Sequence, residues 1–237
     1  MGFYKFADRV FEIKNKYRYL ESFCADYACE EQEPFDVIAV DDEEMMQERM
    51  DSAADAPLPY LETLAVYRKI SERLAEDDCF LMHAAVIEYR GKAYAFSAKS
   101  GTGKSTHIGL WERAFGDEVK VINGDKPLIR KREENGVTQF IVYGTPWCGK
   151  ERKHTNASAV LSGLCRLVRS EENYIKPAGE EAVPFLLSQM LYKKDARYLG
   201  SLMDFADALF QIVPVYELGV NTDISAAFVA RDYMCGI

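Results

Sequence analysis

The stretch AYAFSAKSGTGKSTHIGLW, residues Ala93 to Trp111, decides how the rest of this sequence is interpreted. An apolar run ends in small residues, turns on Gly-Thr-Gly, and continues in a pattern typical of a helix. The turn fits the phosphate-binding pattern G-x-x-x-x-G-K-[ST] except at its first position, where Ala98 replaces glycine. Because alanine adds only a methyl group, a backbone with negative φ accommodates it. The stretch therefore predicts a nucleotide-phosphate site.

The chemistry of such a turn gives its residues separate roles. Backbone N–H groups converge on the phosphates, and the N-terminus of the following helix favours negative charge. Lys104 would reach the outer phosphates, and the Ser105 hydroxyl would bind Mg²⁺. A glycine-rich turn with a chance Gly-Lys-Ser is the alternative, which the flanking strand and helix patterns disfavour. The predicted nucleotide-binding residues are Ser100, Gly101, Thr102, Gly103, Lys104, Ser105 and Thr106.

A histidine upstream of the turn is expected to lie beside it. Arg90-Gly91 separates two apolar runs, CFLMHAAVIEY and KAYAFSA, and predicts a two-residue hairpin. In that register His83 faces Ala98, at the base of the turn. An imidazole there would act in proton transfer or bind charge, and a hydrogen-bonded core histidine is the alternative.

Asp125 follows the predicted strand VKVIN, within NGDK. A carboxylate there would act as a base towards an acceptor hydroxyl or approach the bound Mg²⁺ and phosphates, and a turn aspartate beside Gly124 is the alternative. With a second hairpin looping at Glu133–Gly136, Asp125 is expected to face Gly144. The segment GTPWCGKERKH, residues 144–154, would then lie at the same end of the sheet. Its cations would contact phosphate or substrate, or would simply be solvated.

Composition excludes several classes of protein. The chain has 237 residues, 48% of them hydrophobic, and a formal net charge of −9. The acidic balance argues against nucleic acid or an anionic membrane as a partner. No apolar run approaches the roughly 20 residues that cross a bilayer, and charges interrupt the first residues, so we expect a cytoplasmic protein. Six cysteines without C-x-x-C spacing predict reduced thiols rather than a zinc site.

The pattern along the chain predicts two parts. Residues 1–78 form a small mixed unit, with a strand at Phe35–Val40, a capping box at Asp41 and Glu44, and a helix at Tyr60–Leu74. Residues 79–237 form an α/β domain, since strand, phosphate turn, helix and strand follow one another. In its last third we expect two helices and a late strand, at Glu180–Leu191, Arg197–Ile212 and Val213–Val220.

These motifs together resemble the catalytic domain of HPr kinase/phosphorylase and its freestanding relatives, which share a P-loop fold with phosphoenolpyruvate carboxykinase. The resemblance rests on MHAAVIEYRGKAYAFSAKSGTGKST, NGDK, and GTPWCGK with the downstream LSGLCRLVRSEENYI, and covers roughly Cys79 to Val220. It implies ATP and Mg²⁺ as cofactors, with Ser105 and Asp125 as the residues that bind the metal. It also implies Asp125, His83 and Lys104 as the catalytic residues, with Asp125 as the base.

Two departures from the family's pattern bear on function. Paired aspartates stand in the family's HPr kinases where this chain has Gly124 and Asp125, and Ile141–Gly144 lacks the family's second acid. The resemblance therefore implies a kinase that phosphorylates a hydroxyl, most of all serine, of a small molecule, peptide or protein, with residues 1–78 recognising it. A nucleotide-binding regulatory module and a bifunctional HPr kinase/phosphorylase are the alternatives. The donor (ATP, GTP or pyrophosphate) and the oligomeric state, a homo-oligomer included, stay open.

Overall fold

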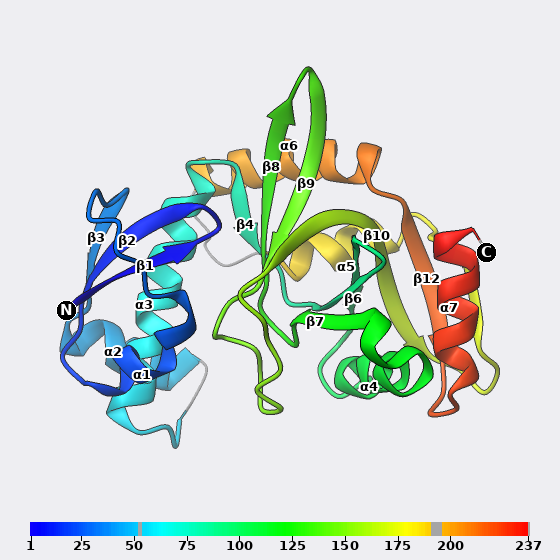
Figure 1. Cartoon of the computed structure of the whole chain (residues 1–237), viewed down its shortest axis with the longest axis horizontal. Coiled ribbons are helices and arrows are strands. Elements are labelled where there is room, and N and C mark those ends of the chain that lie inside the picture. Colours follow the sequence, from blue (N-terminus) through cyan, green and yellow to red (C-terminus); the bar gives the residue numbers. More distant parts are fainter. Residues whose placement is uncertain (52–53, 191–195, 237) are drawn as a thin grey trace. The chain divides into compact units, whose positions relative to one another are not determined.

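The computed structural model describes residues 1–51, 54–190 and 196–236 (Figure 1). The chain divides into two compact units, Met1–Cys79 and Phe80–Ile237. This boundary lies one residue after the predicted limit of the first unit. Both units combine strands with helices, so the fold is mixed α/β.

The first unit is built on a three-stranded sheet in the order β1-β2-β3, with β1 and β2 antiparallel and β3 parallel to β2. Asp41 and Glu44 form the predicted capping box, because the backbone N–H of each donates to the side chain of the other, at 3.0 and 2.9 Å. The elements are β1 (Gly2–Phe6), β2 (Arg9–Lys14), α1 (Tyr19–Phe23), η1 (Ala25–Tyr27), β3 (Asp36–Ala39), α2 (Asp42–Asp51) and α3 (Leu58–Ala75).

The second unit is built on a large mixed sheet that follows the path β4-β8-β9-β10-β6-β5-β7, with β11 and β12 attached beside β10. Its strands are β4 (Cys79–Leu81), β5 (Ala85–Tyr89), β6 (Lys92–Ser97), β7 (Val119–Asn123), β8 (Leu128–Glu134), β9 (Val137–Tyr143), β10 (Ser158–Arg169), β11 (Tyr174–Pro177) and β12 (Val215–Val220). Its helices are α4 (Lys104–Phe115), η2 (Gly116–Glu118), α5 (Ala182–Ser188), α6 (Ala196–Ile212) and α7 (Ser225–Cys235).

Strand β10 is the centre of this sheet. Along one edge it pairs in parallel with β6. Along the other edge it pairs first with β9, which is antiparallel, and then with β12, which is parallel. The carboxyl ends of β6, β10 and β12 therefore lie at the same edge of the sheet. Ligands of α/β proteins bind at this edge. The glycine turn leaves β6 at this end, and Figure 1 shows α4 following it and α7 beside β12.

The first hairpin has the predicted register. Residues pair from Ala85↔Phe96 to Tyr89↔Lys92, and Arg90 and Gly91 turn with φ of 51° and 78°. The run CFLMHAAVIEY, however, is not one strand, because residues 82–84 separate β4 from β5. The backbone N–H groups of residues 82 and 84 donate to Pro127 and Asp125, at 3.2 and 3.0 Å. A fully buried run has no periodicity from which this break could be predicted.

The second hairpin corrects the prediction. Its loop is Asn135-Gly136, with φ of 52° and 77°, instead of Glu133–Gly136. Asn-Gly suits a two-residue turn with positive φ at both positions, and this preference sets the register. The ladder ends at Leu128↔Tyr143, so the prediction that Asp125 faces Gly144 is wrong.

The remaining predicted elements of the second unit mostly appear. Helix α6 and strand β12 match the expected helix and late strand, whereas α5 is shorter than predicted and the predicted end at Leu191 lies outside the described residues. Helix α4 buries Ile108 and Trp111 in an aromatic core with Tyr89 and Phe96. Within the described ranges, none of the helices combines the length and the apolarity that a bilayer crossing requires.

Candidate functional site

The turn from Ala98 to Thr106 joins the end of β6 to the start of α4, as predicted. Gly101 and Gly103 have φ of 76° and 122°, which L side chains rarely adopt. Ala98 is fully buried and is not among the residues with positive φ, so its methyl group fits without backbone strain. The departure from glycine at this position is therefore accommodated.

Three predicted catalytic residues meet at the mouth of this turn. The Nε2 atom of His83 lies 2.9 Å from Nζ of Lys104 and 3.0 Å from Oδ1 of Asp125. They come from the segment between β4 and β5, the first residue of α4, and the loop after β7. Segments far apart in the sequence thus bring an ammonium and a carboxylate into contact with one imidazole.

The position of Asp125 is held by a buried asparagine. Oδ1 of Asn123 accepts hydrogen bonds from the backbone N–H groups of Asp125 and Lys126, at 2.8 and 2.7 Å. Its Nδ2 donates to the carbonyl and hydroxyl oxygens of Thr145, at 2.9 and 3.0 Å. The turn that presents the carboxylate is therefore fixed by hydrogen bonds at both ends of the amide.

The surroundings shift the pKa of two of these groups. Burial lowers the pKa of the Lys104 ammonium, against the attraction of Asp125 and Glu151. Burial alone would raise the pKa of Asp125, but the contact with His83 at 3.0 Å, together with Lys126 and Lys104, lowers it below its ordinary value. Asp125 is therefore an ionised carboxylate at neutral pH.

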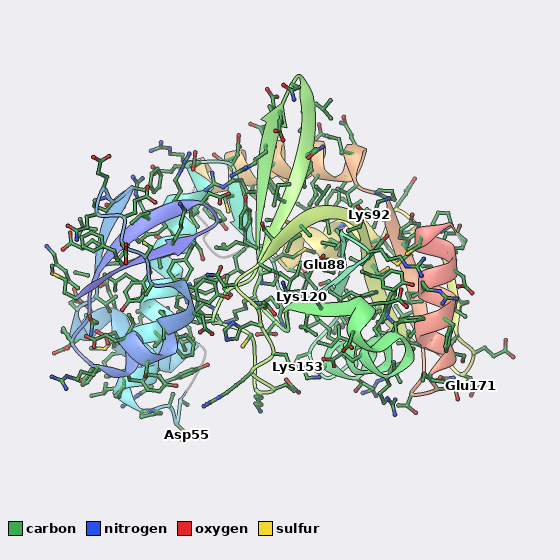
Figure 2. The ribbon with its side chains drawn as sticks, viewed as in Figure 1. Asp55, Glu88, Lys92, Lys120, Lys153 and Glu171 are labelled. Carbon is green, nitrogen blue, oxygen red and sulfur yellow. The ribbon has the colours of Figure 1, made fainter. Side chains whose placement is uncertain are left out.

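Tight packing around Gly124 leaves no room for a side chain. A Cβ on Gly124 would lie 2.8 Å from the carbonyl oxygen of Cys148 and 3.3 Å from that of Lys153. The backbone N–H of Gly124 also donates to Lys153, at 2.9 Å. Lys153, labelled in Figure 2, pairs with Glu112 of α4. The 144–154 segment is thus held against residue 124 and occupies the space that a side chain there would need.

The same segment brings an unpredicted acid to the site. A Cβ on Gly149, which has φ of 83°, would lie 3.2 Å from Cβ of Asp125 and 3.7 Å from Oε2 of Glu151. The carboxylate of Glu151 is thus near Asp125 and close enough to Lys104 to affect its pKa. The sequence predicts a role only for the cations of this segment, of which Lys150 and Arg152 are exposed.

Gln189, which follows α5, is a second residue that sequence reasoning missed. Its Oε1 lies 3.0 Å from Nδ1 of His83, and its backbone carbonyl accepts from the His83 backbone N–H at 2.9 Å. Because 106 positions separate the two residues, no local pattern in a single sequence could have paired them.

A hollow of about 390 Å³ adjoins the turn, within the size range of ligand pockets. Its walls come from the glycine turn, the first turn of α4, and the residues at and after the ends of β10 and β12. The lining residues are Gly101, Thr102, Gly103, Thr106, His107, Arg169, Ser170, Val220, Asn221 and Thr222. Arg169 also donates to the Gly101 carbonyl at 2.6 Å, which ties β10 to the turn.

The donor set suits Mg²⁺ bound together with phosphates. Among the described residues, no group of three His, Cys, Asp or Glu side chains could hold a metal by itself. Mg²⁺ commonly keeps several waters and takes one or two protein oxygens plus substrate phosphates. The Ser105 hydroxyl, at the start of α4, fits that mode, with the Asp125 and Glu151 carboxylates nearby.

Comparison with known proteins gives a distant likeness. No family model matches the sequence. No curated protein matches it either. One similar solved structure is that of the Hpr(Ser) kinase/phosphatase from Coxiella burnetii, with a TM-score of 0.37 and 10% identity, over 66% of this chain and 91% of that chain. Function must therefore be inferred from the residues of the site itself.

Proposed function

We propose that this protein is an ATP-dependent kinase that transfers the γ-phosphoryl group to a hydroxyl, most of all serine, of a small molecule, peptide or protein. The observation that carries the proposal is the meeting of His83, Lys104 and Asp125 at the mouth of the glycine turn. In this proposal residues 79–237 are a P-loop domain of the HPr kinase and phosphoenolpyruvate carboxykinase type. Residues 1–78 recognise the acceptor.

The glycine turn and α4 support binding of the donor. The turn and the helix N-terminus would surround the phosphates, and Lys104 would offset the charge that develops on the transferred group. The adjoining hollow would receive the nucleoside, since Thr102, Gly103 and Thr106 line it and also belong to the turn. Mg²⁺ held at Ser105 would supply further neutralisation of the phosphates.

Asp125 supports the acceptor chemistry. In this assignment it works as the base, because its carboxylate is ionised and contacts an imidazole. It takes the hydroxyl proton while the acceptor oxygen bonds to the γ-phosphorus and the bond to the β-bridging oxygen breaks, with ADP as the leaving group. Nε2 of His83 lies 3.0 Å from Oδ1 of Asp125, next to the proton that this carboxylate would receive.

The second candidate is a regulatory module that binds nucleotide without efficient turnover. The packing around Gly124 favours it, since this backbone leaves no room for the family's first aspartate. Ile141–Gly144 offers no acid in exchange, although Glu151 does lie nearby.

Transfer from γ-labelled ATP to serine-containing peptides and small hydroxyl compounds tests the proposal. We expect Mg²⁺-dependent ADP formation that an acceptor stimulates and that Asp125→Asn removes, while the exposed-acid control Asp117→Asn keeps it. Tight nucleotide binding with ADP formation at background would instead support the regulatory module. Phosphate-dependent release of pyrophosphate from a phosphoserine product would support the bifunctional alternative.

A further inference from the structure

A run of hydrogen bonds leads from the end of α5 into the catalytic cluster. The hydroxyl of Ser188 lies 2.6 Å from the carbonyl oxygen of Phe185, and Nε2 of Gln189 lies 3.0 Å from the Ser188 hydroxyl oxygen. Oε1 of Gln189 then lies 3.0 Å from Nδ1 of His83, whose Nε2 is 2.9 Å from Nζ of Lys104.

Both ends of this run have a fixed direction. A backbone carbonyl can only accept, so the Ser188 hydroxyl donates to Phe185 and its oxygen accepts from Nε2 of Gln189. This orients the Gln189 amide with Oε1 towards His83. At the other end, the ammonium of Lys104 can only donate.

These four bonds favour one tautomer of a neutral His83 ring, in which Nε2 faces both the ammonium of Lys104 and, at 3.0 Å, Oδ1 of Asp125. Nδ1 must carry the proton, because Oε1 of Gln189 accepts it, and Nε2 must carry the lone pair, because Lys104 donates to it. With the proton on Nε2, an N–H would face the ammonium and Nδ1 would face an oxygen. Two of the four bonds would then be lost, and only one, from Nε2 to Oδ1 of Asp125, would be gained.

We propose that Gln189 is a positioning residue, which keeps the proton of His83 on Nδ1 so that Nε2 is always the accepting atom. The role rests on the proposed kinase function. In the nucleotide-free site Nε2 accepts from Lys104. Once phosphates draw Lys104 away, Nε2 faces Oδ1 of Asp125, 3.0 Å distant, and accepts a proton from it when that carboxyl group is protonated.

This arrangement completes the path of the proton during transfer. The acceptor O–H bond breaks as the oxygen bonds to the γ-phosphorus, and the proton goes to Asp125. From Asp125 it passes to Nε2 of His83, which becomes an imidazolium and later releases it to water. The carboxylate is thereby restored for the next turnover.

The protein has three histidines, so ¹⁵N-histidine NMR of the folded chain reports the tautomer directly. The signal of His83 is assigned by its absence in His83→Asn. We expect, in the nucleotide-free protein at neutral pH, a protonated Nδ1 and an unprotonated Nε2 for His83. A proton on Nε2 of neutral His83 would overturn the proposal, and this measurement needs no variant of Gln189.

Gln189→Met keeps the length of the side chain but removes the acceptor, and Gln211→Met, at an exposed position of α6, is the matched control. We expect the proton of His83 to move to Nε2 and kcat to fall about 10- to 100-fold, the range seen when partners that orient a histidine are removed. The Kd for Mg·ATP should change less than about threefold, since the contacts that bind the phosphates remain.

An unchanged kcat in Gln189→Met, or an equal loss in Gln211→Met, would contradict the positioning role. These outcomes are distinct from failure of the kinase proposal. In that case wild-type protein would show no transfer and no Mg·ATP binding, whatever the tautomer of His83.

Discussion

His83 and His107 both lie next to the glycine turn, in different surroundings. The His83 side chain is 31% exposed and has partners on both ring nitrogens, Gln189 on one side and Lys104 with Asp125 on the other. His107 is 1% exposed, its Nε2 accepts from the Trp111 indole at 3.0 Å, and its Nδ1 is buried without a hydrogen-bond partner among the described residues.

This difference separates two roles for one residue type. Burial holds the pKa of His107 at about 3, so it stays neutral and belongs to the aromatic core with Phe96 and Trp111. His83 faces charged groups that can exchange protons and contact phosphate. Proximity to the turn therefore does not decide function; partners and burial do.

The largest expected effect is on phosphoryl transfer and concerns Asp125, the carboxylate that contacts His83. Asp125→Asn keeps the size of the side chain but removes its charge and basic oxygen, so transfer should fall roughly 10²–10⁴-fold. Nucleotide Kd should change far less if Asp125 is the base, and should rise together with the Mg²⁺ requirement if it is a metal ligand. Steady-state kinetics and calorimetry across a Mg²⁺ series measure both. Full transfer by the asparagine variant would end the catalytic assignment.

Lys104→Ala is expected to reduce turnover by roughly 10²–10³-fold, because a charge aimed at the transferred phosphoryl group is lost. Lys150→Ala, an exposed cation of the 144–154 segment, is the control. Equal rates for wild type and Lys104→Ala would remove the glycine turn from the mechanism.

The smallest expected effect concerns the buried His107 and its contribution to the free energy of unfolding. An unfolded histidine has a pKa near 6.5, and His107 has one of about 3 when folded, so the unfolded state binds more protons between these values. This contribution of neutral His107 to the unfolding free energy is present above pH 6.5 and is lost as pH falls. At 1.36 kcal/mol per pH unit, the loss reaches about 2 kcal/mol at pH 5. His107→Gln keeps an acceptor for Trp111 without titrating in this range.

Urea unfolding at pH 7.5 and pH 5 checks this expectation. The loss of unfolding free energy on acidification should be smaller in His107→Gln than in wild type. Identical losses in the two proteins would show that His107 is not held neutral.

The comparison also marks how far the sequence could lead. The glycine turn, its flanking strand and helix, and the β5–β6 register follow from local signals, and Arg90-Gly91 placed His83 near the turn. The Asn135-Gly136 turn is an equally local signal, and a loop at Glu133–Gly136 gives the second hairpin the wrong register because it does not centre on that turn. Nothing local could reveal Gln189 or Glu151 beside His83 and Asp125, because these contacts depend on tertiary packing between distant segments.

The central claim, that the turn binds a nucleotide, is tested most directly by thermal melting of the wild-type protein with Mg·ATP, Mg·GTP and pyrophosphate. We predict that Mg·ATP at a hundredfold excess over its Kd stabilises the folded state by about 2.7 kcal/mol, and that the rise in Tm is lost without Mg²⁺ and in Lys104→Ala. A Tm that stays constant at saturating concentrations of all three compounds would contradict the claim.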